Sequence, residues 1–91
     1  MIDKAYLENL RSRISELETE MSQPGVASDQ KKMQELMRDY SHQKSIATAA
    51  EVFLGLQDTI AESKELLADA SIDAELKEMA EMELAEAEEK L

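Results

Sequence analysis

The first part of the chain carries one apolar stripe at helical spacing. Alternating steps of three and four residues separate its five members: Leu7, Leu10, Ile14, Leu17 and Met21. This spacing places them on one side of an α-helix that packs against a single neighbour. Because Asp3 suits the N-cap and Pro24-Gly25 breaks the pattern soon after Met21, we predict a helix over residues 3–22.

A much longer helical segment follows the Pro-Gly turn. Ser28 is a natural N-cap residue, Asp29 suits the positive end of a helix, and no Pro occurs after position 24. We therefore predict one helix over residues 28–68, about 60 Å long. Gly55 is its weak point, and it predicts either a bend or the close approach of another segment.

The long segment carries two apolar stripes instead of one. At about 100° per residue, the first comprises Met33, Leu36, Met37, Tyr40, Ala47 and Leu54. The second, rotated by roughly 150°, comprises Ile46, Ala49, Phe53, Leu56, Ile60 and Leu67. Two stripes predict two neighbours, so we expect the first helix to pack antiparallel on the first stripe and the last helix on the second.

The last segment predicts a third helix over residues 72–91, capped by Ser71 or Asp73. Its apolar face comprises Leu76, Met79, Ala80, Leu84, Ala87 and Leu91. The helical pattern is intact at Leu91 and no stop signal follows it, which predicts a fragment of a longer protein. The fold expected is all-α, a three-helix antiparallel bundle or hairpin with a long central helix.

Composition agrees with a small helical protein. The 91 residues make at most one domain, and 43% of them are hydrophobic, with two Gly and one Pro. Three aromatic residues leave the core to Leu, Ile, Met and Ala. We expect five methionines to fill that core, although soft side chains also make adaptable binding surfaces; these are Met21, Met33, Met37, Met79 and Met82.

The net charge of −11 narrows the choice of partners. So acidic a surface repels phosphate backbones, and we expect no direct, extended nucleic-acid binding by this segment. A basic protein remains a compatible partner. Residues 71–91 hold eight acids against Lys77 and Lys90, which indicates either a solvated outer face or an acidic docking surface.

The chain gives no sign of export or membrane insertion. It has no Cys, and Asp3, Lys4 and Glu8 interrupt the start, so no signal peptide is recognisable. The longest apolar stretch, residues 46–56, contains Thr48 and Glu51 and is too short for a bilayer. We predict a cytoplasmic protein without membrane contact.

Reactive groups are sparse. Asp39 and His42 have the spacing of a di-metal carboxylate site, but such sites need a second pair and further Glu ligands. Ser41 and Ser45 complete a Ser-His-Asp set only on paper, because all four lie within two turns of one helix, without an oxyanion hole. We therefore predict no catalytic, cofactor-binding or metal residues and no enzyme activity in this segment.

Several short motifs follow one another along the whole chain. They are Ser22-Gln-Pro-Gly-Val26, Asp29, Leu36-Met-Arg-Asp-Tyr40, Glu65-Leu-Leu-Ala-Asp69, Asp73-Ala-Glu-Leu-Lys-Glu-Met-Ala80 and Glu83-Leu-Ala-Glu-Ala87. Their order and spacing resemble the N-terminal helical domain of bacterial class I peptide chain release factors, release factor 1 in particular. Two residues depart from the family pattern. Gly25 stands where the family usually has an acidic or polar residue, and Ala74 stands where it often has Pro. These departures leave the subfamily open.

The resemblance implies that residues 1–91 are the N-terminal domain of a translation termination factor, truncated before the catalytic and codon-reading domains. Peptidyl-tRNA hydrolysis in the family uses a Gly-Gly-Gln loop, which is absent from this chain. The domain is then expected to bind the ribosome through a protein at the stalk base of the large subunit.

The alternative is a stand-alone acidic helical adaptor or coiled-coil protein. The oligomeric state separates the two hypotheses. An isolated release-factor domain is expected to be monomeric or weakly self-associated, whereas an adaptor coiled coil is expected to dimerise firmly.

Overall fold

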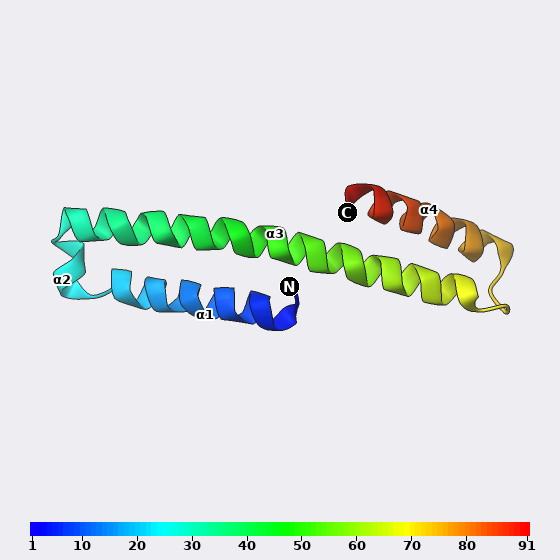
Figure 1. The fold of residues 1–91 in the computed structure, drawn as a ribbon, viewed down its shortest axis with the longest axis horizontal. Coiled ribbons are helices and arrows are strands. Elements are labelled where there is room, and N and C mark those ends of the chain that lie inside the picture. The colour runs from blue at the N-terminus through cyan, green and yellow to red at the C-terminus, as the bar shows by residue number, and fades with distance from the viewer. The chain divides into compact units, whose positions relative to one another are not determined.

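The computed structural model describes all 91 residues and consists of four α-helices without strands (Figure 1). The helices are α1 (Lys4–Met21), α2 (Pro24–Ala27), α3 (Gln30–Ala68) and α4 (Ala74–Lys90). The predicted all-α fold with a long central helix is confirmed. One helix was not predicted, because the Pro-Gly turn is itself a helical turn in which Pro24 takes an opening position, where its fixed φ suits the helix.

Two of the predicted caps are confirmed. The carboxylate of Asp3 accepts a hydrogen bond from the backbone N–H of Tyr6 at 2.9 Å, at the start of α1. Of the two candidates for the last helix, Asp73 is the cap, and its carboxylate accepts from the backbone N–H of Leu76 at 2.7 Å. Each bond satisfies a backbone donor that the helix itself leaves without a partner.

The prediction that Ser28 caps the long helix is wrong. Asp29 is the residue whose carboxylate accepts from the backbone N–H of Lys32, at 3.1 Å. The hydroxyl of Ser28 donates backwards instead, to the carbonyl of Gly25 at 3.2 Å. The extra helical turn α2 is the reason, because Ser28 closes that turn and the next residue opens α3.

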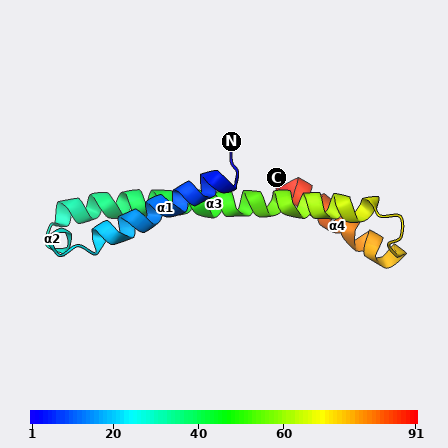
Figure 2. The same ribbon diagram turned by 90° about the horizontal axis from the view of Figure 1, so that it is seen from below.

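The chain forms two compact units, unit 1 (Met1–Glu51) and unit 2 (Val52–Leu91), whose boundary falls within α3. Unit 1 holds α1, α2 and the first part of α3, and unit 2 holds the rest of α3 and α4. Within each unit the shorter helix runs antiparallel beside its part of α3 (Figures 1 and 2). The expectation that the two short helices cover different faces of α3 stays a prediction.

The core of unit 1 is an antiparallel helix pair. The predicted α1 stripe is confirmed, since Leu7, Ile14 and Leu17 are buried and Leu10 and Met21 are half-buried. The covered positions of α3 in this unit include a series at the same spacing: Met33, Leu36, Tyr40, Gln43, Ala47 and Ala50. The two series alternate in steps of three and four residues, as an antiparallel seam requires.

Two residues of unit 1 depart from the predicted stripes. Met37 is 55% exposed although it was predicted on the first stripe, because the seam continues from Leu36 to Tyr40 and Gln43. Ile46, predicted on the second stripe, is half-buried beside Ala47 within unit 1. The amide of Gln43 donates to the carboxylate of Asp39 at 3.5 Å, which gives this polar seam residue a partner.

The core of unit 2 is built from smaller side chains. Ser63 on α3 and Ala80 and Ala87 on α4 are buried, whereas the larger apolar residues of the unit are at most half-buried. The half-buried ones are Phe53, Leu54, Leu56, Ile60, Leu66, Leu67, Ile72 and Leu84. The only buried side chains of unit 2 are therefore small ones. Leu54 was predicted on the first stripe of α3 but falls in unit 2.

The predicted core face of the last helix is partly wrong. Leu76, Met79 and Leu91 are exposed, and only Ala80, Leu84 and Ala87 face the interior of unit 2. Ala49, which was predicted on the second stripe of α3, is exposed as well. A hairpin of two helices covers one seam on each, so residues at the margins of a broad apolar face stay in solvent.

Leu17 is expected to be the most sensitive core position, because its side chain is 0% exposed. We expect Leu17→Ala to lower the free energy of unfolding by about 2–5 kcal/mol through lost burial and the cavity left behind. Urea unfolding followed by circular dichroism measures this change. The control is Met37→Ala at an exposed position, expected to change stability by about 0.5 kcal/mol or less; equal losses for the two variants would contradict the seam described above.

Gly55 is expected to be a site of easy stabilisation. The close approach predicted there is wrong, since a Cβ added to Gly55 meets no atom within 4 Å. Gly55→Ala should therefore raise the free energy of unfolding by about 1 kcal/mol through helix propensity alone. Ala61→Gly, at an exposed position of the same helix, is the matched control and should lower it by a similar amount. A destabilised Gly55→Ala variant would show that α3 is not an ordinary helix at this point.

Candidate functional site

The polar residues considered for chemistry lie on α3 in unit 1. Ser41, His42 and Ser45 are exposed, and none of them has a side-chain hydrogen bond to another of the set. Asp39 takes part in an ion pair with Arg13, at 3.0 Å, which joins α3 to α1. The structure contains no group of three or more His, Cys, Asp or Glu side chains placed to hold a metal ion.

Unit 1 pairs its charges. Arg13 on α1 lies 3.5 Å from Glu16, 3.9 Å from Glu20 and 3.0 Å from Asp39. The pKa of Arg13 is raised, mainly by its hydrogen bond to Asp39. Arg11 forms a second bridge to α3, to Glu51 at 2.9 Å. These are surface pairs that add little stability, but both interhelical ones join α1 to α3 within the same unit.

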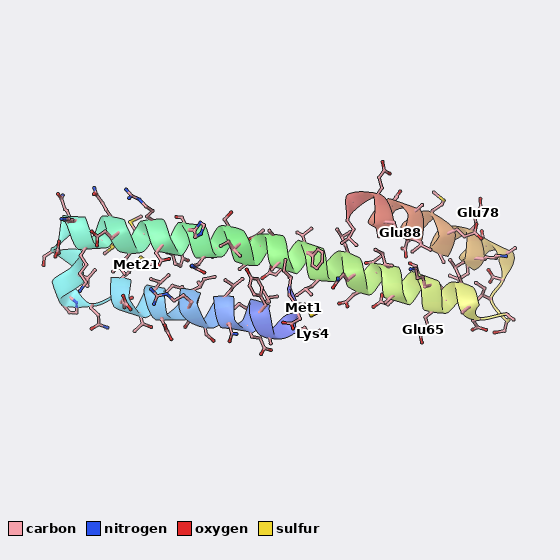
Figure 3. All side chains as sticks on the ribbon, in the orientation of Figure 1. Met1, Lys4, Met21, Glu65, Glu78 and Glu88 are labelled. Atoms are coloured by element: carbon pink, nitrogen blue, oxygen red, sulfur yellow. The ribbon has the colours of Figure 1, made fainter.

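Unit 2 holds most of the charge and none of the ion pairs. Unit 1 has nine acids and seven bases, a net charge of −2, whereas unit 2 has twelve acids and three bases, a net charge of −9. All four ion pairs lie in unit 1. Glu65 on α3 and Glu78 and Glu88 on α4 are among the exposed acids of unit 2 (Figure 3). These carboxylates are free to meet a partner.

Apolar side chains are exposed in the same unit. Val52, Leu76, Met79 and Met82 all lie in solvent. The prediction that the methionines fill the core is therefore wrong for Met79 and Met82, as it is for Met37, and it holds only in part for the half-buried Met21 and Met33. No helix combines the length and apolarity needed to cross a bilayer.

A shallow groove runs between the two helices of unit 2. Its volume is about 210 Å³, and its lining comes from both α3 and α4: Leu56, Thr59, Glu83, Glu86, Ala87 and Lys90. Two of its three charged residues are acids, so the lining combines apolar side chains with a mainly negative charge. The candidate functional site is thus an acidic and partly apolar surface on unit 2.

The connection between α3 and α4 is held by a side-chain turn. The hydroxyl of Ser71 donates to the Asp69 carboxylate at 2.6 Å, and the Ser71 backbone N–H donates to the same oxygen at 2.9 Å. Both bonds favour the ionised form, so the pKa of Asp69 is lowered, with the hydroxyl making the larger contribution. Ser71 thus stabilises this loop; it does not cap α4.

The comparison with protein families decides what kind of domain carries this surface. The model of the PCRF domain matches residues 10–91. This chain belongs to the PCRF domain family. The match covers the seam of unit 1 from Leu10 onward and all of unit 2, so both helical units belong to the matched region.

Curated relatives of this PCRF domain are bacterial proteins named peptide chain release factor 1, which confirms the resemblance inferred from the motif order. The protein of Treponema denticola is 40% identical over 81 residues, 89% of this chain and 22% of that protein. The protein of Alkaliphilus metalliredigens is 35% identical over 91 residues, 100% of this chain and 25% of that protein. The protein of Lawsonia intracellularis is 37% identical over 84 residues, 92% of this chain and 23% of that protein.

The PCRF chain therefore spans about a quarter of the length of the curated relatives it matches. No solved structure matches it.

The Asp69 turn gives a pH-dependent prediction. Because the folded state lowers the pKa of Asp69, its bonds with Ser71 contribute stability at pH above the ordinary Asp value, and this contribution is lost as pH falls through the lowered pKa. Ser71→Ala should raise the pKa of Asp69 part of the way to its ordinary value, since only the backbone donor remains. Carboxyl NMR titration measures this shift. Ser45→Ala, at an exposed position on α3, should leave the titration of Asp69 unchanged, and an unmoved pKa in Ser71→Ala would contradict the assigned cause.

Proposed function

We propose that this PCRF domain serves in translation termination, as a docking domain of a peptide chain release factor that directs stop-codon-dependent release of the polypeptide. The observation that carries the proposal is the match to the PCRF domain model over residues 10–91, together with whole-chain similarity to proteins named peptide chain release factor 1. The site of action is the ribosome in the cytoplasm. As proposed, residues 1–91 form the N-terminal domain of the factor, and they bind without contributing to catalysis.

The proposed partner is a basic protein at the stalk base of the large ribosomal subunit. Unit 2, with a net charge of −9 and no internal ion pair, supports a protein partner over RNA. Its carboxylates repel a phosphate backbone and attract Lys and Arg side chains. As the resemblance implies, peptidyl-tRNA hydrolysis and codon reading are assigned to other parts of the factor, because the Gly-Gly-Gln sequence does not occur in residues 1–91.

The competing function is that of an acidic helical adaptor that pairs with other helices. Family membership favours the release-factor domain. The oligomeric state of the 91-residue chain, measured by analytical sedimentation, distinguishes the two functions independently. A monomer or weak dimer is expected for the docking domain, and a firm dimer for the adaptor.

The proposed docking is tested by cosedimentation of the labelled 91-residue chain with purified large ribosomal subunits. We expect it to sediment with large subunits and not with small subunits, and to lose binding when the large subunits lack the stalk-base protein. Raised salt should weaken the complex, because its attraction is electrostatic.

A charge-reversal pair locates the contact. Glu78→Lys with Glu88→Lys, both in unit 2, should weaken binding about tenfold or more, equivalent to about 1.4 kcal/mol. Glu8→Lys with Glu18→Lys makes the same change of net charge at exposed positions of unit 1 and should have a much smaller effect. Equal effects of the two variants would show that net charge alone, and not unit 2, governs binding. No binding to either subunit would refute the docking role.

A further inference from the structure

One flank of α4 carries a second series at helical spacing whose side chains are exposed in unit 2. Leu76, Met79, Glu83 and Glu86 follow one another at steps of three, four and three residues, so they share one side of the helix. The series runs beside the covered seam of Ala80, Leu84 and Ala87. It extends about 15 Å along the helix, and Met82 lies next to its apolar end.

The apolar end of this flank is in solvent. Leu76 is 38% exposed, Met79 58% and Met82 60%. Clustered exposed apolar side chains mark interaction sites more often than single ones do. Methionine is unbranched and polarisable, and therefore adapts to the shape of a partner.

The other end of the flank is acidic and continues into the groove of unit 2. Glu83 and Glu86 line that groove together with the apolar Leu56 and Ala87. Neither carboxylate has an ion-pair partner, since all four pairs lie in unit 1. A ligand lying along α4 would thus meet apolar side chains first and carboxylates about two turns further on.

We infer that this flank of α4, defined by Leu76, Met79, Met82, Glu83 and Glu86, is the docking surface for a basic amphipathic helix of a protein partner. Leu or Ile side chains of that helix would cover the exposed Leu and Met residues, while its Lys or Arg side chains would pair with Glu83 and Glu86. This arrangement is the helix-in-groove mode of recognition. The inference rests on the proposed function, because docking requires a protein partner. It adds the place on α4 where that partner binds and the kinds of side chain that make the contact.

Charge selects this occupant over the others. A second copy of the chain would bring an equally acidic α4, and like charges facing one another destabilise an interface. An anionic membrane or a nucleic acid is repelled in the same way. A basic helix satisfies both the apolar and the acidic halves of the flank.

The test is a methyl NMR titration of the 91-residue chain labelled at its methionine methyl groups. The probe is a synthetic helical peptide with Leu at alternating steps of three and four and Lys at the other positions. The six methionines report from both units. We expect the Met79 and Met82 signals to shift and saturate, while the exposed Met37 signal in unit 1 stays in place. A peptide with Ser in place of Leu should bind more weakly, and one with Glu in place of Lys should not bind.

Matched variants decide whether the flank carries the affinity. Met79→Ser with Met82→Ser should raise the Kd for the peptide about tenfold or more, and Glu83→Gln with Glu86→Gln should raise it and reduce its dependence on salt. Met37→Ser should leave the Kd unchanged. Circular dichroism checks that each variant is folded. An unchanged Kd in Met79→Ser with Met82→Ser, or equal shifts at Met37 and Met79, would overturn the inference. So would Met79 and Met82 shifts that depend on protein concentration without peptide, since a second copy would then be the occupant.

The peptide titration and the sedimentation experiment together separate this inference from the proposed function. If the chain binds the peptide through Met79 and Met82 but does not sediment with large subunits, the docking surface stands and the ribosomal role fails. If the chain binds large subunits but the Met79 and Met82 signals do not shift when the peptide is added, the ribosomal role stands and the inferred surface fails.

Discussion

The antiparallel seam between each short helix and α3 is the interaction on which the rest of the structure depends. A helix of 39 residues whose surface is mostly exposed gains little from burial by itself. In unit 1 the seam residues Leu7, Ile14 and Leu17 supply the burial that pays the conformational cost of ordering the chain. The 3-4 spacing along α1 matches the spacing along α3, and the short connection through α2 makes the pair antiparallel.

Both units contain an antiparallel helix seam, but different kinds of side chain form it. Unit 1 buries Leu and Ile and ties α1 to α3 with Arg11 and Arg13. Unit 2 buries Ser63, Ala80 and Ala87, forms no ion pair and holds most of the negative charge. The buried Ser63 hydroxyl has no hydrogen-bond partner, a cost that unit 1 does not carry. Unit 1 thus holds the larger buried side chains and the ion pairs, and unit 2 the more exposed and more acidic surface.

Sequence reasoning was accurate where a single local rule applied. Asp3 and Asp73 cap their helices, and the α1 stripe is covered as its spacing predicts. It was wrong where two rules competed. Ser28 and Asp29 are both good caps, and the unpredicted turn α2 decided between them. Met37 and Leu36 both fit the first stripe, and the seam through Gln43 left Met37 outside. The candidate surface was predictable only in part. The acids of α4 can be read from the sequence, whereas the exposure of Met79 and Met82 cannot.

By itself, the sequence determined the number of long helices, most of their caps, the seam of α1, the net charge and the family to which the chain belongs. These properties depend on residue type and short-range spacing, which a linear chain records directly. Only the tertiary structure decided which apolar residues were covered. Burial depends on which side of a helix faces its neighbour. In unit 2 Ser63, Ala80 and Ala87 take the buried positions, while Leu76, Met79 and Met82 stay exposed. A helical pattern identifies the candidates for burial, but the position of the neighbouring helix selects among them.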